Sequence, residues 1–242
     1  MKAFGFIAVV ITGTLLLYAE GDLPRFGDPD SPASQSGVST HYIEKTYEES
    51  HVPNLVTAVL ADYRSYDTMF ETVVIFTAGI SIFAILGGLG SQTHRKWRPM
   101  PEDKIIRMTC RILAPIIQVF ALYVLMNGHY SPGGGFQGGV IFAASFILLA
   151  ISGDLDLALK RLSSKKFLII AAFGIIFYAG HGIASMLLGG NFLEYGVLAP
   201  DAVQAHYWGI LGVEIGVFLT VTTIMFGIYA ALSTRGALKR GL

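Results

Sequence analysis

Ionisable side chains inside long apolar stretches are the residues of this sequence with the clearest capacity for chemistry. Glu214 lies seven residues after Tyr207, about 10 Å along a helix that starts there, at ~1.5 Å per residue. Within a membrane such a group is costly and is typical of ion or proton paths. A lone carboxylate there either stays neutral or takes up a cation. Glu214 is therefore a candidate ion- or proton-exchanging group or, alternatively, a neutral acid that hydrogen-bonds a neighbouring helix.

Three further positions have similar potential. His181 lies between two glycines in an apolar run, where it could relay protons or simply pack. Glu71 follows Asp67 by four residues, so the two share one helix face. Arg64 lies close by as a counter-charge. This acidic pair could serve an ion path, or it could form a surface ion pair at the entrance of a helix.

The most specific local pattern is GHYSPGGGFQGG at residues 128–139. A proline followed by three glycines is incompatible with a stable helix interior. Irregular backbone at membrane depth is tolerated where it is buried in protein or lines a watery cavity. The segment could therefore offer carbonyls or amides to an ion, or form a tight hairpin between two helices. Its candidate structural residues are His129, Pro132, Gly133, Gly134, Gly135, Phe136, Gly138 and Gly139.

The elements that position these residues are long apolar helices. The chain is 53% hydrophobic and 14% charged, whereas soluble domains contain about 25% charged residues. A membrane-spanning helix needs about 20 mainly apolar residues. Six stretches meet or approach this length, which predicts an all-α integral membrane protein. They are Ala3–Tyr18, Thr68–Leu89, Ile105–Met126, Phe136–Ile151, Phe167–Leu188 and Tyr207–Ala231.

Charge asymmetry predicts the orientation of the spans. Lys and Arg gather in the loops at 94–104 and 152–166 and in the C-terminal tail, whereas the alternate loops contain few. The positive-inside rule therefore places both termini in the cytoplasm and residues 20–66 outside. Residues 21–50, with three prolines, are expected to form an external loop or linker. The apolar run Leu55–Ala61 is too short to span, which favours an interfacial or re-entrant helix.

Several functional classes lack support in the sequence. The formal net charge is zero, so no nucleic-acid partner is expected. There is no CxxC, HExxH, GxxxxGK[ST] or GxSxG pattern, so metalloprotease, NTPase and hydrolase sites are not expected. We expect no cofactor and no metal site in this chain. Buried ionisable groups and interrupted backbone indicate transport or coupling.

These residues resemble a known family. The segment 128–139 is similar to the signature of the MnhB/MrpB family, the B subunits of Mrp-type multisubunit sodium/proton antiporters. The GGNFL loop at 189–193 and the last span, with VEIGV at 213–217, fit the same family, so this resemblance covers about residues 91–242. Glu214 stands where many members of the family have Asp. The side chain is one methylene longer, which keeps the charge but changes its reach.

Upstream, residues 54–77 contain ADYRSYDT at 61–68 and then Glu71. This element resembles the C-terminal end of the antiporter A subunits and a small subunit of membrane-bound hydrogenases. Ser65 and Met69 depart from that pattern. The resemblance implies two parts: a two-span element at 1–90 and a four-span MnhB-like domain at 91–242.

The family resemblance implies a subunit of a Mrp-type complex that exchanges Na⁺ and H⁺ across a prokaryotic cytoplasmic membrane. Its partners would be the other subunits and lipid, and the chain itself would not be an enzyme. One alternative is an ion-translocating subunit of a ferredoxin-linked hydrogenase or oxidoreductase related to complex I. The other is a non-conducting scaffold subunit. On the first interpretation Glu214, Glu71 and His181, with Asp67 and Arg64, are the ion-path candidates.

Overall fold

The computed structural model describes residues 2–32, 34–35, 37–89, 104–154, 158–159, 162 and 164–234. Every regular element within these residues is helical. The α-helices are α1 (Lys2–Glu20), α2 (Gly37–Ser50), α3 (Leu55–Ala58), α4 (Ser65–Leu89), α5 (Lys104–Met126), α6 (Gly135–Leu149), α8 (Ser164–Leu187) and α9 (Ala202–Ser233). Two π-helical segments, η1 (Val59–Tyr63) and η2 (Ala150–Asp154), and a 3₁₀ turn, η3 (Tyr195–Val197), complete the list.

Six of these helical stretches are long and apolar enough to cross a membrane: α1, α4, α5, α6 with the start of η2, α8 and α9. The predicted all-α architecture with six candidate spans is confirmed. The last helix begins earlier in the chain than predicted. Asp201 caps it, its side chain accepting a hydrogen bond from the Val203 amide, so α9 begins five residues before the predicted Tyr207. Glu214 therefore lies about 18 Å from the first helical residue at ~1.5 Å per residue, deeper along its helix than predicted.

The segment expected to be an external loop contains α2, so the expectation of irregular structure fails for residues 37–50. That stretch lacks proline after Pro32 and contains three glutamates and one lysine, which have good helix propensity. The short apolar run forms α3 and η1. Asn54 caps α3 through its side chain, which accepts a hydrogen bond from the Val56 amide.

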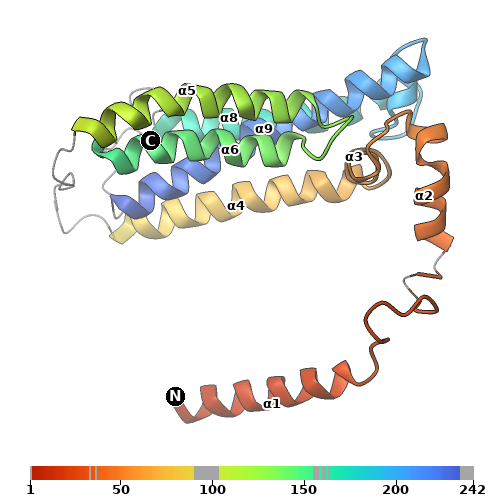
Figure 1. Ribbon diagram of the computed structural model, residues 1–242, viewed down its shortest axis with the longest axis horizontal. Coiled ribbons are helices and arrows are strands. Elements are labelled where there is room, and N and C mark those ends of the chain that lie inside the picture. Colours follow the sequence, from red (N-terminus) through yellow and green to blue (C-terminus); the bar gives the residue numbers. More distant parts are fainter. Residues whose placement is uncertain are drawn as a thin grey trace. The chain divides into compact units, whose positions relative to one another are not determined.

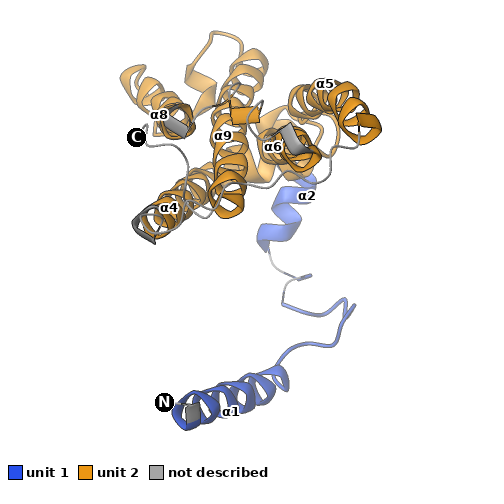
Figure 2. Cartoon of the chain, turned by 90° about the vertical axis from the view of Figure 1, so that its left-hand side faces the viewer, with its two compact units in different colours: residues 1–45 blue, residues 46–242 orange. Residues whose placement is uncertain are grey.

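Helix α9 is the centre of the bundle. It packs against α8, α6 and α4 and is the most buried of the six candidate spans, with these neighbours around it (Figures 1 and 2). Small residues permit this approach: a Cβ on Gly216 would lie 2.6 Å from the Gly174 carbonyl oxygen of α8. Thr220 donates a hydrogen bond to the Ala171 carbonyl at 2.9 Å, and Thr222 donates one to the Gly139 carbonyl at 3.2 Å. The core therefore combines close backbone contact with interhelical hydrogen bonds.

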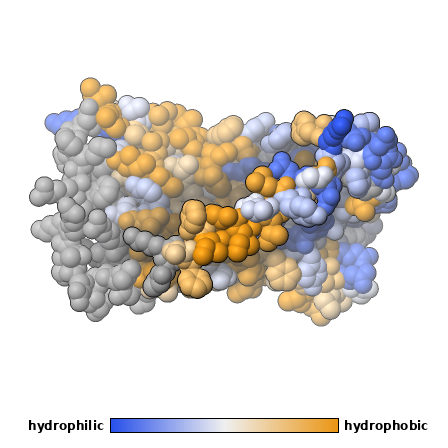
Figure 3. All heavy atoms as spheres, turned by 90° about the horizontal axis from the view of Figure 1, so that it is seen from below, coloured by the Kyte–Doolittle hydropathy of each residue, from blue (hydrophilic) through white to orange (hydrophobic). Residues whose placement is uncertain are grey.

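The chain divides into two compact units, Met1–Lys45 and Thr46–Leu242 (Figure 2). Helix α1 belongs to the first, and its described side chains are almost all exposed and apolar. Hydrophilic residues gather at one end of the view in Figure 3, the end at which α3 is labelled in Figure 1. The basic residues that predict the orientation lie largely outside the described residues. The cytoplasmic location of the termini and the division near residue 90 stay predictions.

Candidate functional site

The Glu214 side chain is enclosed by the glycine-rich turn between α5 and α6. Glu214 is 7% exposed. A Cβ added to Gly128 would lie 3.1 Å from Glu214 Oε1, and one added to Gly134 would collide with the same oxygen. A Cβ on Gly135 would collide with the Glu214 backbone carbonyl. Three glycines of the turn are therefore required for its close approach to this one residue of α9.

The turn itself is an ordered hairpin. Gly134 adopts φ 113°, a conformation that strongly favours glycine, directly before the first residue of α6. Its amide donates to the Val124 carbonyl at 3.1 Å, and its carbonyl accepts from the Gly138 amide at 3.0 Å. The segment is therefore a tight hairpin, which is the second of the two interpretations, and it encloses the Glu214 side chain.

The turn carbonyls are bound by the segment around α3. Asn54 Nδ2 donates to the carbonyls of Gly128 and Ser131, both at 2.8 Å, and Thr57 Oγ1 donates to the Gly128 carbonyl at 2.7 Å. The Asn54 amide donates to the His129 carbonyl at 3.0 Å. These oxygens are satisfied by protein donors, so the suggestion that they are offered to an ion finds no support here.

His129 is buried within the turn, with 1% of its surface exposed. Its ring stacks on the Tyr207 ring of α9, with the ring centroids 4.5 Å apart. Burial lowers the pKa of His129, and a hydrogen bond between its ring and the Tyr207 backbone offsets this only in part. Among the described residues, Glu214 Oε2 has no hydrogen-bond partner.

The other predicted ion-path residues make different contacts from those of Glu214. His181 is half-buried on α8, with Nδ1 2.9 Å from the Phe177 carbonyl oxygen. Its ring fills the space beside Gly212, where a Cβ would collide with it. This geometry is typical of a packing residue. His181 therefore lies beside α9, where its ring contacts Gly212.

On α4, Glu71 is exposed. Arg64 and Asp67 form an exposed ion pair, in which Arg64 Nε donates to Asp67 Oδ2 at 2.6 Å. Tyr178 of α8 is within electrostatic reach of both Glu71 and Glu214, and its hydroxyl donates to the Ser65 carbonyl at 2.8 Å. Both carboxylates thus lie near one buried tyrosine, although Glu214 is enclosed and Glu71 is exposed on the surface of this chain.

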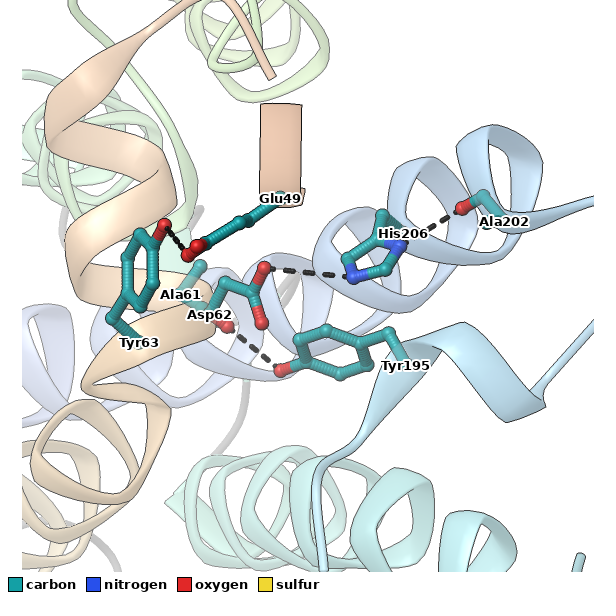
Figure 4. Close-up of polar contacts among 7 residues, drawn as sticks. All are labelled: Glu49, Ala61, Asp62, Tyr63, Tyr195, Ala202 and His206. Atoms are coloured by element: carbon teal, nitrogen blue, oxygen red, sulfur yellow. Dashed lines mark hydrogen bonds and ion pairs between the residues drawn. The ribbon is translucent and has the colours of Figure 1, made fainter. Parts of the chain in front are cut away.

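A polar cluster that the sequence reasoning missed joins η1 to the start of α9 (Figure 4). Asp62 Oδ2 lies 3.7 Å from His206 Nε2, and His206 Nδ1 lies 2.8 Å from the Ala202 carbonyl oxygen. The Tyr195 hydroxyl donates to the Ala61 carbonyl at 2.8 Å. Burial raises the pKa of Asp62, although the nearby Ser50 hydroxyl and His206 favour its ionised form.

Beside it, the Tyr63 hydroxyl donates to Glu49 (Figure 4), and burial together with this hydrogen bond raises the pKa of Tyr63 to about 12. Asp62 lies within the 61–68 pattern, but only the π-helical turn directs it at His206. No local sequence signal pairs residues so far apart in the chain. Within the described residues, no group of three His, Cys, Asp or Glu side chains is arranged to hold a metal ion.

Comparisons with protein families match two parts of the chain. Residues 105–227 match the domain related to the MnhB subunit of Na⁺/H⁺ antiporters. Residues 30–107 match the MbhE family, which is the E subunit of MBH.

Two relatives have similar identity but different coverage. An uncharacterized protein of Methanocaldococcus jannaschii is 35% identical over 179 residues, which are 67% of this chain and 64% of that protein. This chain therefore spans just under two thirds of that relative. A putative antiporter subunit mnhB2 of Staphylococcus haemolyticus is 35% identical over 137 residues, which are 54% of this chain and 95% of that subunit.

Two solved structures share the fold. One is a chain of the membrane-bound sulfane sulfur reductase, an archaeal respiratory membrane complex, with a TM-score of 0.67 and 24% identity over 96% of this chain and 97% of that chain. The other is a chain of the Mrp complex from Dietzia sp., with a TM-score of 0.65 and 23% identity over 99% of this chain and 26% of that chain.

Proposed function

Because this chain belongs to the family of domains related to the MnhB subunit of Na⁺/H⁺ antiporters, we propose that it is a membrane subunit of a Mrp-type cation/proton antiporter complex. It contributes to ion translocation and to assembly of the complex. The chain is a multi-pass membrane protein, and its location is the cytoplasmic membrane of a prokaryote. Its partners are the other subunits of the complex, Na⁺ and H⁺ are the transported ions, and no redox or hydrolytic step occurs in this chain.

The observation that carries the proposal is the enclosure of Glu214 by the glycine turn. A carboxylate buried among apolar helices is expensive unless a proton or cation neutralises it. The side chain has one oxygen against the turn and one with no hydrogen-bond partner among the described residues. Such a group can alternate between a neutral acid and an ion-binding carboxylate. Glu214 is therefore the exchanging residue of this proposal.

The remaining candidates have secondary roles. Glu71 is exposed on α4, so it serves an ion path only where a neighbouring subunit covers it. Arg64 and Asp67 form an ion pair at the start of that helix. His181 supports α9 through its contact with Gly212.

A second candidate function has specific support. The match of residues 30–107 to the MbhE family and the fold shared with a respiratory membrane complex favour the same ion-translocating module within a redox-driven assembly. The proteins that co-purify with this chain separate the two functions. A mass-spectrometric inventory that contains iron–sulfur or nickel–iron subunits assigns the chain to the redox complex, whereas antiporter subunits alone assign it to the Mrp type.

The exchange role of Glu214 is tested in membrane vesicles that contain the complete complex. Glu214→Gln keeps the size and hydrogen bonding of the side chain but removes its titratable charge. We expect it to assemble and to lower sodium-dependent proton exchange by at least about tenfold, roughly 1.4 kcal/mol. Glu214→Asp should retain a substantial part of the exchange.

Glu194→Gln is the matched control, because Glu194 is an exposed carboxylate in the α8–α9 connection. Its exchange rate should equal that of the parent. Parent-like exchange by Glu214→Gln would instead assign the carboxyl group a purely structural role and favour the scaffold alternative.

A further inference from the structure

The contact between Asp62 and His206 joins the two family regions of the chain (Figure 4). Asp62 lies in η1, within residues 30–107 that match the MbhE family. His206 lies near the start of α9, within residues 105–227 that match the domain related to the MnhB subunit. Asp62 Oδ2 and His206 Nε2 are 3.7 Å apart, and the two side chains are 19% and 15% exposed. A contact in this position can influence how firmly the two regions hold together.

The hydrogen bond on the other side of the His206 ring determines what Nε2 can do. Nδ1 lies 2.8 Å from the Ala202 carbonyl oxygen. A carbonyl oxygen only accepts hydrogen bonds, so Nδ1 carries a proton and donates to it. Neutral imidazole has a proton on only one ring nitrogen, so its Nε2 is then an acceptor. Nε2 faces a carboxylate oxygen that is also an acceptor when Asp62 is ionised. The contact is therefore favourable only when the pair holds one additional proton.

Either member of the pair can hold this proton. Protonation of His206 Nε2 gives an imidazolium that attracts the carboxylate, and protonation of Asp62 gives a hydroxyl donor that faces Nε2. At 3.7 Å the two groups are within reach of an ion pair but beyond the usual length of a hydrogen bond. Their charges therefore decide the sign of the interaction, which is attractive with the proton and unfavourable without it.

The charged neighbours of this pair come from the end of α2 and from η1. Burial is the main cause that raises the pKa of Asp62, and the charge of Glu49 acts in the same direction. The charges of His206 and His51 act in the opposite direction. Glu49 accepts a hydrogen bond from the Tyr63 hydroxyl. The His51 ring lies edge-on to the His206 ring, with the ring centroids 5.6 Å apart. These groups modify the affinity of the pair for its proton, but Asp62 and His206 are the two that face each other.

The remaining neighbours favour a proton as the ligand of this pair. From η3, the Tyr195 ring lies edge-on to the His206 ring at 6.4 Å. Its hydroxyl donates to the Ala61 carbonyl, so its proton is already used. The Ser50 hydroxyl near Asp62 is neutral. Hard cations prefer several oxygen ligands, and in the described part of the chain no three His, Cys, Asp or Glu side chains are grouped to hold a metal ion.

We propose that Asp62 and His206 form a proton-binding site that fastens η1 to α9 while the proton is bound and loosens this contact when the proton leaves. Both side chains are partly exposed, so the proton exchanges with water. The element that responds is a π-helical turn, a rare structure that frequently lies at functional sites. Within it the Arg64 amide donates to the Val59 carbonyl at 2.8 Å. The site is independent of the proposed exchange role of Glu214.

Amide hydrogen exchange of residues 59–64 in the complete complex tests the proposal, with rates corrected for the intrinsic effect of pH. In the parent, protection of these amides should fall at least about tenfold between about pH 5 and about pH 8, because the pair loses its proton over this range. In Asp62→Asn the side-chain amide donates to Nε2 at either pH, so protection should stay high. In His206→Phe the contact is absent, so protection should be low at both pH values.

Asp67→Asn is the matched control, because Asp67 is an exposed carboxylate close to η1 that pairs with Arg64. It should keep the pH dependence of the parent. Amides of α8 in the parent should be equally protected at both pH values, which distinguishes loosening of η1 from a general loss of stability. Equal protection of residues 59–64 at the two pH values in the parent overturns the proposal, as does parent-like pH dependence in Asp62→Asn. If His206→Phe does not assemble, the parent and Asp62→Asn decide the question.

Discussion

Glu214 on α9 and Glu71 on α4 are two glutamates in helices of similar character that have opposite surroundings. Both helices are long and apolar enough to span a membrane. Glu214 is enclosed by glycines that bring backbone against its side chain, whereas Glu71 is exposed on the surface of this chain. Closure within the subunit offsets the cost of burying the Glu214 carboxylate. For Glu71 we predict instead that a neighbouring subunit covers the carboxylate.

The largest expected effect comes from closing the space around Glu214. A Cβ at Gly135 would collide with the Glu214 carbonyl, so Gly135→Ala must displace α6 from α9, at a cost of about 1–3 kcal/mol or more. Gly134→Val adds strain at φ 113°. Both variants should reduce assembly and thermal stability of the purified complex.

Gly180→Ala is the matched control for these glycine variants. Gly180 is also helical, but a Cβ there would meet nothing within 4 Å. We expect the complex with Gly180→Ala to melt at or slightly above the parent temperature, because alanine has the better helix propensity. Equal stability of Gly135→Ala and Gly180→Ala would show that the turn does not need its close approach.

A smaller effect is expected when the exposed carboxylate is changed. Glu71→Gln should lower sodium-dependent exchange less than Glu214→Gln does, because Glu71 gains an apolar environment only from a neighbouring subunit or lipid. The two variants are compared in the same vesicles at equal amounts of assembled complex. A loss with Glu71→Gln as large as with Glu214→Gln would place both groups on one path and remove the distinction drawn between them.

The smallest effect concerns pH and the Asp62–His206 cluster. Burial raises the pKa of Asp62 above its value of about 3.9 in an unfolded chain. The folded state therefore binds this proton first, and the associated stability is present at low pH and is lost as pH rises through the raised pKa. Asp62→Asn removes this dependence. We expect a gain of about 1 kcal/mol or less near pH 8 that disappears near pH 4.

Melting curves of the detergent-purified complex at the two pH values measure this change. Asp67→Asn provides the comparison, since Asp67 is an exposed partner of Arg64. The change in the melting temperature of Asp67→Asn should be small at both pH values, because an exposed ion pair contributes little to stability. A destabilised Asp62→Asn variant at pH 8 would mean that the contact with His206 outweighs the burial of Asp62.

The sequence by itself determined the helical architecture, because the length and polarity of an apolar run are local properties. It also indicated the family through residues 128–139, and it marked Glu214 as an ionisable group in an apolar helix. The boundary of α9 was less accurate, since the polar cap Asp201 lies beyond the apolar run that marks the span. Helix α2 was missed because its composition lacks an apolar face.

Only the tertiary structure decided which ionisable groups are enclosed. In the sequence His129 is only one residue of a turn pattern, yet packing against Tyr207 buries its ring. Asp62 meets His206 through a π-helical turn that propensity does not encode. His181 and Glu214 looked alike in the sequence, but one fills the space beside Gly212 and the other the space beside Gly128 and Gly134. Such outcomes depend on contacts between distant segments, and a local pattern contains no information about which face of a helix its neighbours will cover.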